Sequence, residues 1–67
     1  MENKIDSHVE ASLMIIAGDL NELNEEIKIF YSSEEEDKEL TDSIIDYFDE
    51  IIYNCKIAKK RIDDRYV

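Results

Sequence analysis

Residues 32–39 of the chain read SSEEEDKE and separate two long stretches in which apolar residues recur every three or four positions. Five of these eight residues are carboxylates. Ser33 and Glu36 have the spacing of a capping box, in which a serine oxygen and a glutamate each bind a free amide at the start of a helix. Carboxylates also favour the positive end of the helix dipole. The stretch lacks the alternating oxygen ligands and the glycine of a calcium-binding loop. It therefore predicts the start of a helix rather than a metal site.

The stretch before this point predicts one long helix over about residues 7–31. Ser7 and Glu10 form another capping-box pair at its start. Gly18 could interrupt the helix, because Asp19 begins a further pair of this kind. The apolar repeat nevertheless continues across both residues without a change of phase, which favours a single helix. This repeat consists of Val9, Leu13, Ile16, Leu20, Leu23, Ile27 and Phe30.

The stretch after the acidic segment predicts a second helix over about residues 34–62. Its apolar repeat consists of Ile44, Phe48, Ile51, Cys55, Ala58 and Ile62. Ile45, Tyr47 and Ile52 flank the repeat and widen the apolar face to about 160°, whereas a helix needs about 100° to cover one core. One hairpin could not cover this surface, but two hairpins packed as a four-helix bundle could. We therefore expect an all-α fold, in which an antiparallel two-helix hairpin dimerises into a four-helix bundle and Cys55 is a small core residue.

The composition is that of a single small helical domain over residues 1–67. A chain of this length buries only about 60% of its unfolded surface, which favours self-association. Hydrophobic residues make up 43% of the chain, which is too many for a disordered acidic segment. No signal peptide is evident, and no apolar run approaches the roughly 18 residues of a membrane span. The single Cys55 and single His8 provide neither an internal disulfide nor a zinc site. We expect a cytoplasmic protein with no metal and no cofactor.

The net charge of −10 is unevenly distributed along the chain. Residues 1–55 carry sixteen acidic and three basic side chains, a balance of −13, whereas residues 56–67 carry five basic and two acidic side chains, a balance of +3. The acidic part of the chain would repel nucleic acid and anionic membranes and attract basic surfaces. The expected partner is therefore a basic protein, with no direct contact to nucleic acid or to a membrane.

Four carboxylates resemble the metal-binding motif of the all-α nucleoside triphosphate pyrophosphohydrolases of the MazG type. Glu22-x-x-Glu25 and, after thirteen intervening residues, Glu39-x-x-Asp42 match the E-x-x-E and E-x-x-D pairs of that family. The resemblance implies a magnesium site beside a bound triphosphate. On a helical wheel, however, the four side chains point about 130–170° away from the apolar stripes, so they would not converge inside the bundle. We therefore expect no enzymatic activity and retain a fragment of such an enzyme as an alternative.

A second alternative is an RNA-binding hairpin dimer. The length, the two helices and the segment DEIIYNC at residues 49–55 resemble the plasmid copy-control proteins of the Rop type, which dimerise as four-helix bundles. The resemblance implies RNA recognition by basic and aromatic residues on the exposed side of the first helix. Here that side carries five acidic residues and only Lys28, so the resemblance concerns architecture more than RNA binding.

The favoured hypothesis is a non-catalytic interaction protein that works through a row of carboxylates on the second helix. Like charges four residues apart cost about 0.2–0.5 kcal/mol each, and this helix repeats them on the side opposite the core. Carboxylates spaced about 5 Å apart along a rigid helix could take the place of phosphates on a basic, nucleic-acid-binding protein. Short acidic helical proteins of this kind resemble inhibitors and regulators encoded by phages and mobile elements. The partner-binding residues are predicted to be Glu35, Glu39, Asp42, Asp46, Asp49 and Glu50.

Overall fold

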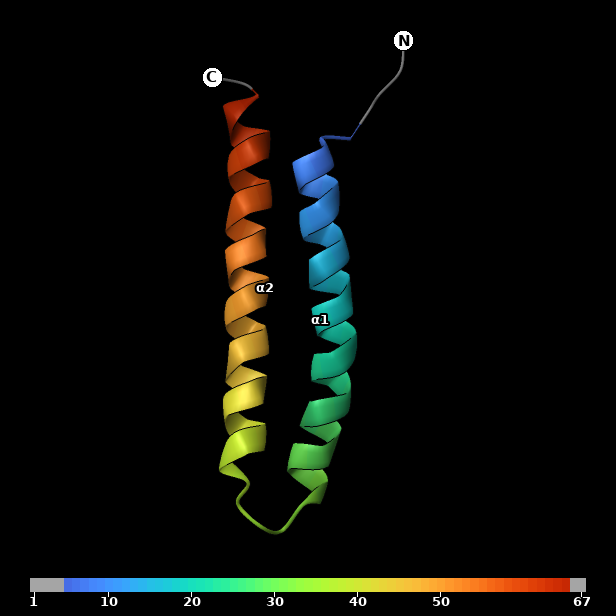
Figure 1. Ribbon diagram of the computed structural model, residues 1–67, viewed down its shortest axis with the longest axis vertical. Coiled ribbons are helices and arrows are strands. Elements are labelled where there is room, and N and C mark those ends of the chain that lie inside the picture. The colour runs from blue at the N-terminus through green and yellow to red at the C-terminus, as the bar shows by residue number, and fades with distance from the viewer. Residues whose placement is uncertain (1–4, 66–67) are drawn as a thin grey trace.

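The computed structural model describes residues 5–65, which form two antiparallel helices joined by a short turn (Figure 1). Helix α1 spans Ser7–Ser32 and helix α2 spans Lys38–Asp64. The helices pack side by side along their length and form a rod with principal extents of 55 × 21 × 13 Å. The predicted all-α hairpin is therefore confirmed. No helix among residues 5–65 is both long enough and apolar enough to cross a membrane.

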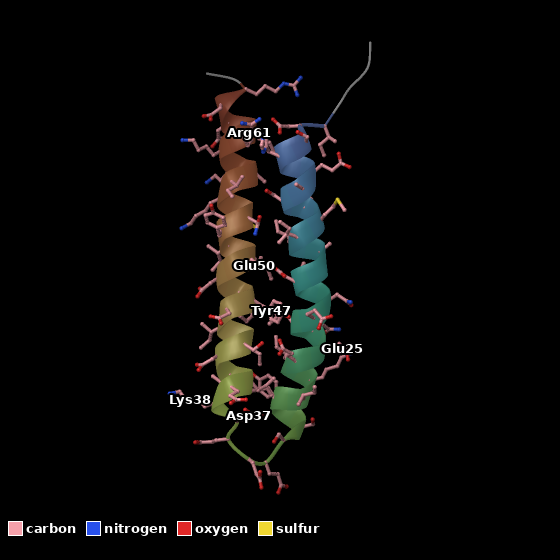
Figure 2. All side chains as sticks on the ribbon, viewed as in Figure 1. Glu25, Asp37, Lys38, Tyr47, Glu50 and Arg61 are labelled. Carbon is pink, nitrogen blue, oxygen red and sulfur yellow. The ribbon has the colours of Figure 1, made fainter. Side chains whose placement is uncertain are left out.

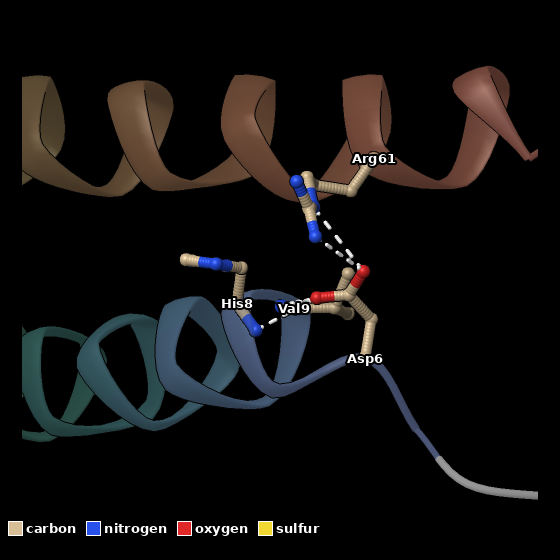
Figure 3. Close-up of polar contacts among 4 residues, drawn as sticks. All are labelled: Asp6, His8, Val9 and Arg61. Atoms are coloured by element: carbon tan, nitrogen blue, oxygen red, sulfur yellow. Dashed lines mark hydrogen bonds and ion pairs between the residues drawn. The ribbon is translucent and has the colours of Figure 1, made fainter.

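Helix α1 begins with Asp6 as its N-cap, one residue before the predicted serine. The Asp6 carboxylate accepts hydrogen bonds from the backbone N–H of His8 at 2.8 Å and of Val9 at 3.4 Å. The other carboxylate oxygen accepts from Arg61 near the end of α2, at 2.8 Å from Nη2 and 3.2 Å from Nε (Figure 3). The bond to Arg61, followed by those to the two amides, lowers the pKa of Asp6. One side chain thus starts α1 and ties it to α2.

Helix α2 begins at Lys38, four residues later than predicted. Asp37 is its N-cap and accepts a hydrogen bond from the backbone N–H of Leu40 at 3.0 Å. The Ser33 hydroxyl instead accepts from the N–H of Glu35 at 3.3 Å and so stabilises a local turn. The backbone of Ser33 is extended and ends α1. The residues that follow Ser33 are needed to reverse the chain before α2 begins. Residues 34–36 therefore lie in the turn rather than in the first turn of α2.

The line of contact between the helices is displaced from the centre of the predicted apolar stripes. Six side chains are buried among the described residues, and three of them are polar: Val9, Leu23, Ala58, Ser12, Asp19 and Asn54. Leu20, at the centre of the α1 stripe, is 52% exposed, and Phe48 on α2 is 46% exposed. Cys55 is also exposed in the single chain. The helices are thus rotated so that one edge of each apolar stripe meets the other helix while the opposite edge faces outward.

Candidate functional site

Four of the predicted partner-binding carboxylates lie on the outward side of α2. Glu39, Asp42, Asp46 and Asp49 are all exposed, and their spacing of three or four residues places them on one side of a continuous helix. We call these four residues the outer acidic row. With a rise of 1.5 Å per residue, the row extends over about 15 Å.

The structure separates the other two predicted carboxylates from this row. Glu35 is exposed but lies in the turn between the helices, so it adds charge at one end of the row without sharing the helical spacing. Glu50 extends from the side of α2 that faces α1, as its position in Figure 2 shows. The hydrogen bond that protonated Glu50 can donate to Asp19 of α1, followed by the charge of Asp19 and partial desolvation, raises the pKa of Glu50. Glu50 is exposed and lies at the edge of the contact between the helices.

Polar side chains form one edge of that contact, which we call the polar seam. Its members are Ser12, Asp19 and Glu26 on α1 and Ser43, Tyr47, Glu50 and Asn54 on α2. The Ser43 hydroxyl donates to the Glu26 carboxylate, with oxygen distances of 2.8 and 3.1 Å. The Asn54 side chain donates to the backbone carbonyl of Glu50 at 2.8 Å. The bond between Ser43 and Glu26 joins the two helices, whereas the Asn54 bond lies within α2.

Asp19 is a buried carboxylate in the polar seam. Its side chain is only 8% exposed, and its Oδ2 atom has no hydrogen-bond partner among the described residues. The hydroxyl of Tyr47 is affected by Asp19 and by other acidic side chains near the seam. Partial burial, followed by the charges of Glu26, Glu22, Asp19 and Glu50, raises the pKa of Tyr47. The seam therefore concentrates negative charge between the helices as well as on the outer surface.

Sequence reasoning missed the seam because it treated acidic residues as solvent-facing. A signal was nevertheless present: Ser12, Asp19 and Glu26 are seven residues apart, directly beside the equally spaced Val9, Ile16 and Leu23. Residues seven apart lie on nearly the same side of a helix. A polar row that follows an apolar row in this way is typical of the margin of a helix–helix contact.

The opposite edge of the contact carries two grooves between the helices, an apolar one near the turn and one at the open end that is lined by apolar and charged residues. The groove near the turn is lined by Ile27, Phe30, Tyr31, Thr41, Ile44, Ile45 and Phe48. The groove at the open end of the hairpin is lined by Ile5, Asp6, Val9, Leu13, Arg61, Ile62, Asp64 and Arg65. Both are open surface grooves, and apart from the buried Val9 their lining side chains are half-buried or exposed.

The four carboxylates of the pyrophosphohydrolase-like motif are not brought together as a metal site. Glu22, Glu25, Glu39 and Asp42 are all exposed, and Glu25 extends away from α2 (Figure 2), where it forms an ion pair with Lys28 at 3.7 Å. Over residues 5–65, no three acidic, histidine or cysteine side chains are grouped closely enough to hold a metal ion.

Comparison of the chain with protein-family models, curated protein sequences and solved structures gave no match.

Proposed function

We propose that this chain is a small non-catalytic interaction protein that inhibits or regulates a basic host protein of the kind that binds nucleic acid. Its origin would be a phage or another mobile element, and it would act as a homodimer. The binding surface is the outer acidic row, extended by Glu35 at the turn. The proposal places this activity in the cytoplasm, where a lone thiol such as that of Cys55 stays reduced.

The observation that supports this proposal is that no member of the outer acidic row forms an ion pair among residues 5–65. The ion pairs within residues 5–65 join Lys28 to Glu25 and Arg61 to Asp6, and neither includes a member of the row. Neighbouring carboxylates in the row repel one another at about 0.2–0.5 kcal/mol per pair. Lysine at one of these exposed positions would relieve that repulsion without disturbing the contact with α1. A cationic partner would relieve the same repulsion on binding.

The chemistry of the row favours a partner with a basic groove or stripe. Carboxylates accept hydrogen bonds from arginine and lysine as phosphates do, and arginine can bind them through two parallel bonds. A net charge of −10 on a small chain would also raise the rate of encounter with a basic protein. The rigid helix holds the carboxylates in place before binding, which lowers the entropic cost of association.

The proposal is tested by removing three charges from the row and three charges from elsewhere. The test variant carries Asp42→Asn, Asp46→Asn and Asp49→Asn. The control carries Glu10→Gln, Glu22→Gln and Glu25→Gln, which changes the net charge equally on the exposed surface of α1. Partners captured from host lysate would be quantified by mass spectrometry, and the affinity of each would then be measured by calorimetry at about 0.05 and 0.5 M salt.

We expect the test variant to lose the partner and the control to retain it. The affinity of the wild type should fall as salt is raised, because salt shortens the Debye length from more than 10 Å to a few ångströms. Equal affinity of the two variants, unaffected by salt, would show that the outer acidic row is only a solvated surface.

A further inference from the structure

Several apolar residues that are exposed or half-buried lie on one face of the hairpin, whereas the exposed Met14, Ile15 and Ile29 lie on other sides of α1. Residues seven apart share a side of a helix, and on this face each helix contributes one row of apolar residues with that spacing. The groove at the open end brings Leu13 beside Ile62, and the groove near the turn brings Ile27 beside Phe48. The two rows are therefore neighbours at both ends. We call them the apolar face, which consists of Leu13, Leu20, Ile27, Phe48, Cys55 and Ile62.

The apolar face points in the direction in which a helix of a four-helix bundle would meet a second neighbouring helix. At 100° per residue, the row through Phe48, Cys55 and Ile62 lies about 90° around α2 from the side that meets α1. In a four-helix bundle each helix contacts two neighbouring helices, and the two contact sides are separated by roughly this angle around the helix axis. The outer acidic row lies on the remaining side of α2, away from both contacts. A second hairpin on the apolar face would thus leave the proposed binding surface open.

The exposed area of the chain is larger than a compact monomer requires. The solvent-accessible surface is 5891 Å², whereas a compact monomer of 7.9 kDa exposes about 4400 Å². One partner in a standard protein interface buries about 800 Å², so a second copy could bury a full interface and still leave the acidic side open. Among residues 5–65 no large side chain is completely buried, so the single hairpin has only a thin core.

The two ends of the hairpin differ strongly in charge. Near the turn, residues 25–46 carry nine carboxylates and two lysines, a balance of −7. At the open end, residues 5–14 and 56–65 together carry four carboxylates and five basic side chains, a balance of +1. The hairpin therefore has a charge gradient along its length.

We propose that two copies pack apolar face to apolar face with their turns at opposite ends. The proposal builds on the homodimer that forms part of the proposed function. Packed helices lie about 8–10 Å apart, and the Debye length in physiological salt is about 8 Å. Turns at the same end would place two charges of −7 together with incomplete screening. Turns at opposite ends place each acidic end beside the open end of the other copy.

The arrangement can be tested by placing one spin label in each turn. The chain would carry Cys55→Ser, which removes the native thiol, and Glu34→Cys, which is labelled with a nitroxide. Pulsed electron resonance then measures the distance between the two labels of a dimer. Because the 27 residues of α2 rise by about 40 Å, opposite turns should give a distance near or above that length. A distance below about 25 Å, less than the rise of 17 helical residues, would place both turns at one end and overturn the proposal.

Sedimentation of two matched variants tests the face itself. Phe48→Glu introduces charge into the apolar face and should yield a 7.9 kDa monomer. Tyr53→Glu introduces the same charge at an exposed position on the outward side of α2 and should remain dimeric. A monomeric wild type at high concentration, or equal association of both variants, would overturn the proposal. None of these measurements uses the basic partner, so failure of partner binding and failure of the dimer are distinguishable.

Discussion

At the scale of single residues, the least expected feature is the carboxyl pair formed by Asp19 and Glu50 across the hairpin. A carboxylate buried without a complete set of hydrogen bonds costs free energy, and a second carboxylate beside it adds repulsion. A proton shared by the pair removes the repulsion and supplies the missing donor. The raised pKa of Glu50 expresses this preference for one bound proton.

We predict that Asp19→Asn weakens the pH dependence of stability. Because the pKa of Glu50 is higher in the folded chain, the pair stabilises the fold most below the ordinary glutamate value of 4.5. This contribution is lost as the pH rises through the raised value. An amide at position 19 can donate to the Glu50 carboxylate at every pH and has no charge. Urea unfolding measured between about pH 4 and pH 8 should therefore show a smaller decline in the variant than in the wild type.

The matched control is Asp46→Asn, which removes one charge from the outer acidic row. It should lower the general repulsion slightly but leave the decline above pH 4.5 in place. If Asp19→Asn and the control gave the same pH profile, the proton shared between the helices would not contribute to stability.

At the scale of the helices, Gly18 is a weak point that the fold does not require. It lies in the middle of α1, has no positive φ, and a Cβ atom added there would have no other atom within 4 Å. Glycine in a helix costs about 0.5–1 kcal/mol relative to alanine, because more conformational freedom is lost on folding. Gly18→Ala should raise the free energy of unfolding by this amount, measured by urea denaturation. The exposed neighbour Ala17 provides the reverse control, since Ala17→Gly should lower it similarly. An unchanged or lower stability of Gly18→Ala would mean that α1 needs flexibility at this point.

The helices themselves could be predicted from periodicity, and their boundaries only in part. The apolar repeat correctly predicts that α1 continues through Gly18, because a break in the helix would change the phase of the repeat. The sequence predicts a start of α2 that is too early, because Ser33 and Asp37 both precede acidic residues and capping chemistry alone does not select between them. The deciding factor is that the chain needs the residues between them to reverse direction, which depends on the position of α1.

The candidate site is also only partly predictable from the sequence. The spacing of Glu39, Asp42, Asp46 and Asp49 was enough to place them on one exposed side of a helix. A helical wheel gives directions around one axis, but it does not say which side meets the neighbouring helix. The sequence therefore groups Glu50 with the predicted partner-binding carboxylates, although Glu50 faces Asp19 across the polar seam.

At the scale of the whole molecule, the hairpin has three sides with different chemistry: a polar seam, an apolar face and an outer acidic row. The contact between α1 and α2 uses only part of the apolar surface. Side chains in the contact should stabilise the fold of one chain, whereas side chains on the apolar face should stabilise the fold through association. Leu23, which is 3% exposed, and Phe48, which is 46% exposed, represent the two cases.

We predict that Leu23→Ala and Phe48→Ala differ in how their effects depend on protein concentration. Leu23→Ala should lower the free energy of unfolding by about 2–5 kcal/mol at every concentration, because it leaves a cavity between α1 and α2. Phe48→Ala should abolish the rise in melting temperature that association produces as the wild type is concentrated. Its destabilisation should therefore be small in dilute solution and increase with concentration. Thermal unfolding followed by circular dichroism between about 5 and 500 μM would measure both effects. If the wild type melted at the same temperature throughout this range, the half-exposed ring of Phe48 would contribute to a single chain only, and the apolar face would not be an interface between two copies.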